Sequence, residues 1–150
     1  MINYREMIPL DIPNLVALER AIFPESPWSS AQFREAFAGV PRPRRYLIGE
    51  ADGQIIAYAG IAIAGDCADI HTIAVVPEYR GRGIATELLA QLESWAIKKG
   101  AVALMLEMRE GNNEALPLYQ GRGYQIISRR KDYYAPGIHA LIMRKEVAHE

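Results

Sequence analysis

Residues 68–100 form a strand–loop–helix pattern, which limits the chain to folds in which an apolar strand runs almost directly into a long helix. The apolar run Ala68–Val76 predicts a strand, and Pro77 ends it. Two glycines, Gly81 and Gly83, occupy the loop that follows. A helix is expected after them, because apolar residues then recur on one stripe: Ile84, Leu88, Leu89, Leu92, Trp95 and Ala96. Gly100 provides its C-terminal cap.

The loop before this helix has the chemistry of an anion site. Glycine lets the backbone approach a ligand closely, and the first turn of a helix presents unpaired N–H groups at the positive end of its dipole. Together they suit a diphosphate, to which Arg80 and Arg82 would add charge-assisted contacts. An ordinary glycine-rich turn with solvated arginines explains the same composition equally well. The stretch Gly81-Arg82-Gly83-Ile84-Ala85-Thr86 matches neither the P-loop nor the dinucleotide-binding glycine motif.

Length, charge and cysteine content restrict the class of protein further. The chain has 150 residues, which suits a single domain over residues 1–150. Its 17 Lys and Arg against 18 Asp and Glu give a net charge of −1, so we expect no nucleic-acid partner. Cys67 is the single cysteine, which excludes an internal disulfide and a cysteine-rich metal site and favours a reducing, cytoplasmic compartment. No signal peptide or membrane span is expected, since no apolar run approaches about 20 residues.

Periodicity along the rest of the chain predicts an α/β domain. Two helices are expected early, one capped by Asp11 and one opened by Ser29 and Gln32 at capping-box spacing. Three later strands follow one another across short turns, which favours an antiparallel meander. The expected strands cover residues 2–7, 45–50, 55–64, 68–76, 102–108, 124–131 and 139–145. The resulting order is β-α-α-β-β-β-α-β-α-β-β, a mixed, mostly antiparallel central sheet flanked by helices.

Pro117 conflicts with the last helix that the pattern predicts. This helix opens at Asn112 or Asn113, where an asparagine can serve as N-cap, and runs to about Arg122. Beyond the first turn a proline would clash with the carbonyl four residues earlier. The helix must therefore start late or kink at Pro117.

The loop residues Arg80-Gly81-Arg82-Gly83-Ile84-Ala85 resemble the R/Q-x-x-G-x-G/A motif of the GCN5-related N-acetyltransferases, the GNAT superfamily. The likeness continues through Leu106–Arg109, Asn112–Tyr119 and Gly123-Tyr124, in the order of the superfamily. It implies the GNAT fold and acetyl-coenzyme A (acetyl-CoA) as co-substrate, with no metal. By this resemblance the coenzyme is held by the backbone of Ile73, Ala74 and Val75, by Arg80, Gly81, Arg82, Gly83, Ile84, Ala85 and Thr86, and by Asn112.

Acetyl transfer to an amine needs a base for the amine and an acid for the departing thiolate. Glu107 ends an apolar strand, and from spacing alone a solvated glutamate explains it better than a base. Tyr119 lies about two helical turns after Asn112, where a tyrosine can also simply fill core space. The superfamily resemblance assigns Tyr119 as general acid, and resemblance to a narrower branch of the superfamily assigns Glu107 as general base. Cys67 has no base nearby in sequence, so direct attack in a ternary complex is expected rather than an acetyl-enzyme.

A narrower resemblance concerns the acceptor. Phe23-Pro24, Pro27-Trp28-Ser29, His71–Val75 and Arg130–Tyr134 are similar to a branch of the superfamily that acetylates the N-terminal alanine of a small-subunit ribosomal protein. This implies a protein N-terminus as partner, in a groove walled by Trp28 on one side and by Tyr133 and Tyr134 on the other. Cross-strand packing explains the paired tyrosines equally well.

Two other functions agree with the same residues. One keeps the chemistry and changes the acceptor to a lysine side chain or a small-molecule amine. The other is an acyl-CoA-binding sensor domain without activity. The sequence predicts no oligomeric state.

Overall fold

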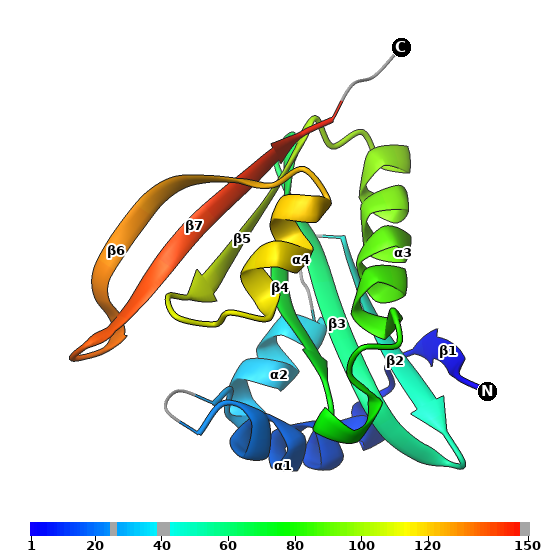
Figure 1. The fold of residues 1–150 in the computed structure, drawn as a ribbon. Helices are drawn as coiled ribbons and strands as arrows, with labels where there is room; N and C mark the ends of the chain where they lie inside the picture. Colours follow the sequence, from blue (N-terminus) through cyan, green and yellow to red (C-terminus); the bar gives the residue numbers. More distant parts are fainter. Residues whose placement is uncertain (25–26, 39–42, 148–150) are drawn as a thin grey trace.

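The computed structural model of the chain describes residues 1–24, 27–38 and 43–147, which form one sheet with helices against it (Figure 1). The strands and helices follow one another along these residues in the expected order. The strands are β1 (Asn3–Glu6), β2 (Arg44–Ala51), β3 (Gln54–Ala64), β4 (Cys67–Val75), β5 (Ala103–Arg109), β6 (Gln125–Ala135) and β7 (Ile138–Glu146). The α-helices are α1 (Ile12–Ile22), α2 (Ser30–Ala38), α3 (Ile84–Lys98) and α4 (Ala115–Gly121), and single 3₁₀ turns cover Pro9–Asp11 and Pro77–Tyr79.

The sheet opens at its centre, between β4 and β5. Its strand order is β1-β2-β3-β4-β5-β7-β6, and every pair is antiparallel except β4 with β5. This parallel pairing runs from Cys67 with Ala103 to Ile70 with Leu106, and it stops there. The last residues of β4 therefore have β3 as a strand partner on one side only, and on the other side the Val75 carbonyl accepts a hydrogen bond from Arg80.

The two faces of the sheet bury separate apolar clusters, because successive side chains of a strand point to opposite faces. In β2, Leu47 belongs to the cluster under α3, whereas Tyr46 and Ile48 belong to the cluster with Leu15 of α1 and Phe33 of α2. Helix α3 lies along β3 and β4 (Figure 1). In the described part of the chain, each helix lacks the length and apolar character that a bilayer crossing requires.

Of the two helix N-caps predicted from the sequence, the structure confirms the one at Ser29 and not the one at Asp11. The capping box is confirmed, since Ser29 N–H donates to Gln32 Oε1 over 2.9 Å and Gln32 N–H donates to Ser29 Oγ over 3.1 Å. The capping role of Asp11 is wrong, although α1 does begin directly after it. The Asp11 carboxylate accepts hydrogen bonds of 2.8 Å from the Arg5 guanidinium and from the backbone N–H of Ile8, so it is turned away from the first N–H groups of α1.

Helix α4 resolves the conflict at Pro117 by starting late. It begins at Ala115, so Pro117 is its third residue and lies in the first turn, where its missing N–H costs no helical hydrogen bond. Asn112 Oδ1 accepts the N–H groups of Glu114, over 3.3 Å, and Ala115, over 3.1 Å, and so caps the helix from three residues upstream. The N-cap position itself is Glu114 and neither of the predicted asparagines, and Tyr119 is the fifth residue of the helix.

Gly60 lets the ring of Tyr46 cross β3. A Cβ at position 60 would lie 2.3 Å from Tyr46 Cε2, and the Tyr46 ring is buried. We therefore expect Gly60→Ala to lower the free energy of unfolding by about 1–3 kcal/mol, measured by urea denaturation. Gly49→Ala in β2 is the control, since its Cβ would stay 3.4 Å from the nearest atom. Equal stability of the two variants would contradict this account.

Candidate active site

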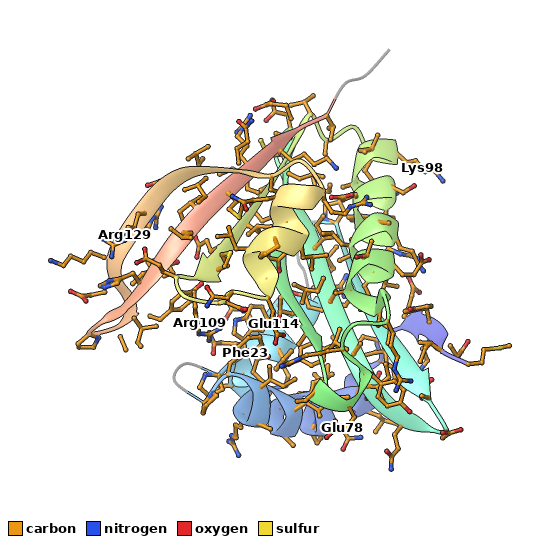
Figure 2. The ribbon with its side chains drawn as sticks, in the orientation of Figure 1. Phe23, Glu78, Lys98, Arg109, Glu114 and Arg129 are labelled. Atoms are coloured by element: carbon orange, nitrogen blue, oxygen red, sulfur yellow. The ribbon has the colours of Figure 1, made fainter. Side chains whose placement is uncertain are left out.

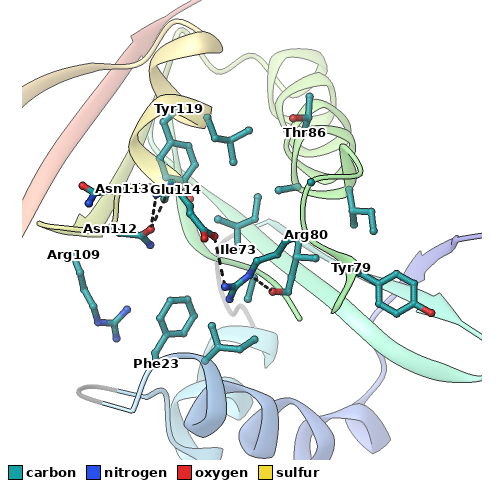
Figure 3. Close-up of a pocket in the computed structure, with 18 of the residues that line it drawn as sticks. Phe23, Ile73, Tyr79, Arg80, Thr86, Arg109, Asn112, Asn113, Glu114 and Tyr119 are labelled. Carbon is teal, nitrogen blue, oxygen red and sulfur yellow. Dashed lines mark hydrogen bonds and ion pairs between the residues drawn. The ribbon is translucent and has the colours of Figure 1, made fainter. Parts of the chain in front are cut away.

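A cleft of about 760 Å³ opens where β4 leaves β5, between the start of α3 and the start of α4 (Figure 3). The predicted coenzyme residues line it with one exception, Arg82. Those that do are Ile73, Ala74, Val75, Arg80, Gly81, Gly83, Ile84, Ala85, Thr86 and Asn112.

The glycine loop turns its backbone toward this cleft. Gly81 and Gly83 have φ of 78° and 77°, a conformation that residues with a Cβ rarely adopt. Gly83 is the N-cap of α3, and no side chain caps the helix, so its first N–H groups remain available. A diphosphate fits this site, because backbone donors and the positive helix end face the same open space.

The two arginines of the loop have different surroundings. Arg82 lies against the ring of Tyr79, with its guanidinium carbon 4.7 Å from the ring centroid, and donates to the carbonyl of Glu78. Arg80 turns into the cleft, where its Nε donates to the Val75 carbonyl over 3.0 Å and its Nη1 lies 3.6 Å from Glu114 Oε2 (Figure 3). Arg80 is therefore the loop cation that a ligand in the cleft would meet.

A second cavity, the acceptor groove, continues from the cleft along the opposite part of β4 and β5. Consecutive residues of both strands line it, 69–73 of β4 and 105–109 of β5, and strict alternation fails in β4 because its register to β3 shifts at His71. The predicted wall residues Trp28, Tyr133 and Tyr134 all line it. The residues that line both cavities are Phe23, Ile73, Arg109, Asn112, Ala115 and Tyr119.

Glu107 lies in the groove with its carboxylate exposed to it. Tyr133 lies close to this carboxylate, and its interaction with Glu107 raises the pKa of Tyr133. Tyr133 was expected only as a wall of the groove. In the structure it also lies beside the carboxylate assigned as base.

A local irregularity in β6 brings the paired tyrosines into the groove. The predicted strand ended at Lys131, but β6 extends to Ala135, with its register to β7 shifted between Arg130 and Ala135. Asp132 has φ of 54°, and its N–H donates to His139 Nδ1 over 2.9 Å, while its Oδ1 accepts the N–H of Gly137. Such a bulge re-aims side chains, so the tyrosines face the groove instead of forming cross-strand pairs.

Tyr119 is buried at the boundary of the two cavities. Only 5% of its surface is exposed, and its ring packs edge-on against Tyr124 with a centroid distance of 6.0 Å. Burial raises the pKa of Tyr119, and the nearby Tyr134 hydroxyl adds to this. The phenol is therefore neutral over the physiological range and keeps a proton to donate.

Glu19 is a groove residue that the sequence reasoning missed. It is 2% exposed, and its carboxylate accepts the Trp28 N–H over 3.2 Å and the hydroxyl of Tyr58 over 2.5 Å. Burial raises its pKa, against the effect of these hydrogen bonds and of Arg109. A signal was present, since Glu19 follows Leu15 by four residues and so interrupts the apolar stripe of α1.

The sequence assigns no role to His71. In the structure His71 lines the acceptor groove. Its Nδ1 is 2.6 Å from the hydroxyl of Tyr46, and its ring lies 6.1 Å from that of Trp28. Burial raises the pKa of Tyr46, so the phenol stays protonated and can donate to Nδ1. Cys67 lines neither cavity, and the described residues contain no cluster of ligands suited to a metal ion.

The two cavities adjoin, one beside a glycine loop and a helix N-terminus and the other containing Glu107, and they share Tyr119, an arrangement that agrees with the layout expected of an acyl transferase. Residues 12–124 match the family described as Acetyltransferase (GNAT) family, which is most of the chain. The chain therefore belongs to the GNAT acetyltransferases, and the expected fold class is confirmed.

Individual relatives show which proteins within this family the chain is similar to. The chain is 35% identical over 143 residues to the N-alpha-acetyltransferase RimI of Mycobacterium tuberculosis, covering 91% of this chain and 87% of the relative. The crystal structure of the ribosomal-protein-S18-alanine N-acetyltransferase from Escherichia coli superposes with a TM-score of 0.83 at 26% identity, covering 100% of this chain and 96% of that one. A longer Mycobacterium leprae protein is 35% identical over 146 residues, and the chain spans 39% of its length.

Proposed function

We propose that the protein transfers the acetyl group of acetyl-CoA to the α-amine of the N-terminal alanine of ribosomal protein bS18. The observation that carries this proposal is the position of Tyr119 and Glu107 relative to the two cavities. Tyr119 lies at their boundary, where a thioester sulfur entering from the cleft would end, and Glu107 lies only in the groove.

The cleft supplies the contacts that acetyl-CoA requires. The backbone N–H groups at Gly81, Gly83 and the first turn of α3 bind its diphosphate, with Arg80 as the charged partner. The edge of β4 at Ile73–Val75, which has no strand partner in β5, pairs with the amides of the pantetheine arm, as an added strand would. To contact the diphosphate, Arg80 must exchange Glu114 for the ligand.

Glu107 acts on the attacking amine, and Tyr119 acts on the departing sulfur. Glu107 accepts the proton that the amine loses as it attacks the thioester carbon, and Tyr133 lies beside this carboxylate. A backbone N–H of β4 near Ile73 stabilises the negative charge on the carbonyl oxygen. As the carbon–sulfur bond breaks, Tyr119 donates its proton toward the thiolate.

Two considerations support a protein N-terminus as the acceptor. An α-amine has a pKa of about 7.7–8.0 against about 10.4 for lysine, so a single carboxylate suffices to deprotonate it near neutral pH. The relatives named above are an N-alpha-acetyltransferase and a ribosomal-protein-S18-alanine N-acetyltransferase. Action on a ribosomal protein places the enzyme in the cytoplasm.

The test uses purified protein, acetyl-CoA and two peptides with the N-terminal sequence of bS18, each with an internal lysine. One peptide has a free N-terminal alanine and the other has that amine formylated. Mass spectrometry is expected to show acetylation of the free peptide alone, on the alanine. Equal turnover of the blocked peptide would indicate a lysine acceptor, and coenzyme binding without transfer to any amine would indicate a sensor domain.

A further inference from the structure

The two walls of the acceptor groove meet at one side chain, Arg109. Its guanidinium carbon lies 4.5 Å from the ring centroid of Phe23, at the end of α1, and 4.7 Å from that of Tyr134, in β6. Figures 2 and 3 show Arg109 reaching from the sheet toward Phe23. A planar guanidinium between two rings is held more firmly than one that contacts a single ring, and lysine has no plane to stack.

Arg109 also places a positive charge where the two cavities meet. Among the described residues that line both cavities, it alone carries a formal charge. Its field reaches the groove, since it opposes the increase in pKa of both Glu19 and Tyr134. The acetyl group changes carriers at this boundary, so an incoming amine must come close to the guanidinium.

We propose that Arg109 joins the two walls of the acceptor groove and presents a fixed positive charge to the acceptor amine. This rests on the proposed function, because it assigns a role in recognising that amine. A like charge nearby disfavours the ammonium form, so Arg109 increases the fraction of neutral, nucleophilic amine in the complex. Arg109 thereby complements Glu107, which accepts the proton that the neutral amine loses as it attacks.

The amine also faces the other ionisable groups of the groove. These are Glu19 of α1, Asp69 and His71 of β4, Glu107 of β5, Tyr119 of α4, and Arg130, Tyr133 and Tyr134 of β6. Arg130 is the other arginine among them; it contacts one ring, that of Tyr133 at 5.4 Å, and it does not line the cleft. Arg130 is therefore the matched comparison for Arg109.

The experiment measures kcat against pH with both substrates saturating, because this profile reports groups in the ternary complex. Arg109→Gln is expected to move the acidic limb to higher pH by about half to one unit, so that kcat on the limb falls about threefold to tenfold and recovers on the plateau. Arg109→Lys keeps the limb in place and raises the KM for the peptide. Arg130→Gln moves the limb less than Arg109→Gln.

The charge role of Arg109 would be overturned if the acidic limb of the kcat–pH profile lay at the same pH in wild type and Arg109→Gln. It would also be overturned if Arg109→Gln lowered kcat by the same factor at every pH. Amide hydrogen exchange tests the joining of the walls without any acceptor: exchange at both Trp28 and Tyr134 is expected to rise severalfold in Arg109→Gln, and unchanged exchange would overturn it. If wild type fails to acetylate the free peptide, the proposed function and the amine role fall together. An active wild type with an unshifted limb removes only the inference about Arg109.

Discussion

Replacing Glu107 with glutamine is expected to lower kcat by about 10²–10⁴ and to leave the affinity for acetyl-CoA within about twofold of wild type. The amide has nearly the shape of the carboxylate, but it cannot accept the proton of the amine. Glu107 lines the acceptor groove and not the coenzyme cleft, so binding of the coenzyme should be unaffected. Steady-state kinetics and calorimetric titration measure the two quantities.

Alkaline pH provides an internal check on this role. Above about pH 9 a free α-amine is already neutral, so the variant should recover part of its loss as pH rises. Glu87→Gln is the control, because Glu87 is an exposed residue of α3 outside both cavities. A Glu107→Gln enzyme with wild-type turnover at pH 7 would remove Glu107 from the mechanism.

The coenzyme cleft was predictable because its signals are local. Pro77, the two glycines and the apolar stripe fix a strand end, a loop and a helix start within a few residues, and α3 indeed begins at Ile84. Backbone groups make most of its contacts, so side-chain placement matters little there. Arg82 is the exception, since its stacking on Tyr79 depends on the path of the loop.

The acceptor groove was less predictable because its residues come from distant segments. The arrangement of Phe23, Arg109 and Tyr134 requires α1, β5 and β6 to converge, which no local pattern encodes. The bulge at Asp132 is equally hidden, since its hydrogen bonds come from Gly137 and His139 across the hairpin. The resemblance to GNAT enzymes identified the wall residues, but not the contacts that aim them.

Tyr119→Phe is expected to lower kcat by about 10²–10³ while the protein stays folded. Phenylalanine keeps the ring that packs against Tyr124, so the substitution removes little beyond the hydroxyl. The affinity for acetyl-CoA should change by less than about threefold, because one neutral hydrogen bond in the ground state contributes little. Steady-state kinetics and thermal unfolding separate the loss of activity from a loss of folding.

The raised pKa of Tyr119 determines how the hydroxyl acts. In water, transfer from such a phenol to a thiolate with a pKa of about 8.5 would be uphill. Burial also raises the pKa of a thiolate formed beside Tyr119, so the two groups become better matched, and the hydroxyl stabilises the sulfur as its charge develops. Wild-type kcat should therefore hold its plateau to about pH 10, without a falling limb from an ionising Tyr119. A limb near pH 9 that Tyr119→Phe abolishes would show an exposed, ordinary phenol and contradict the buried acid.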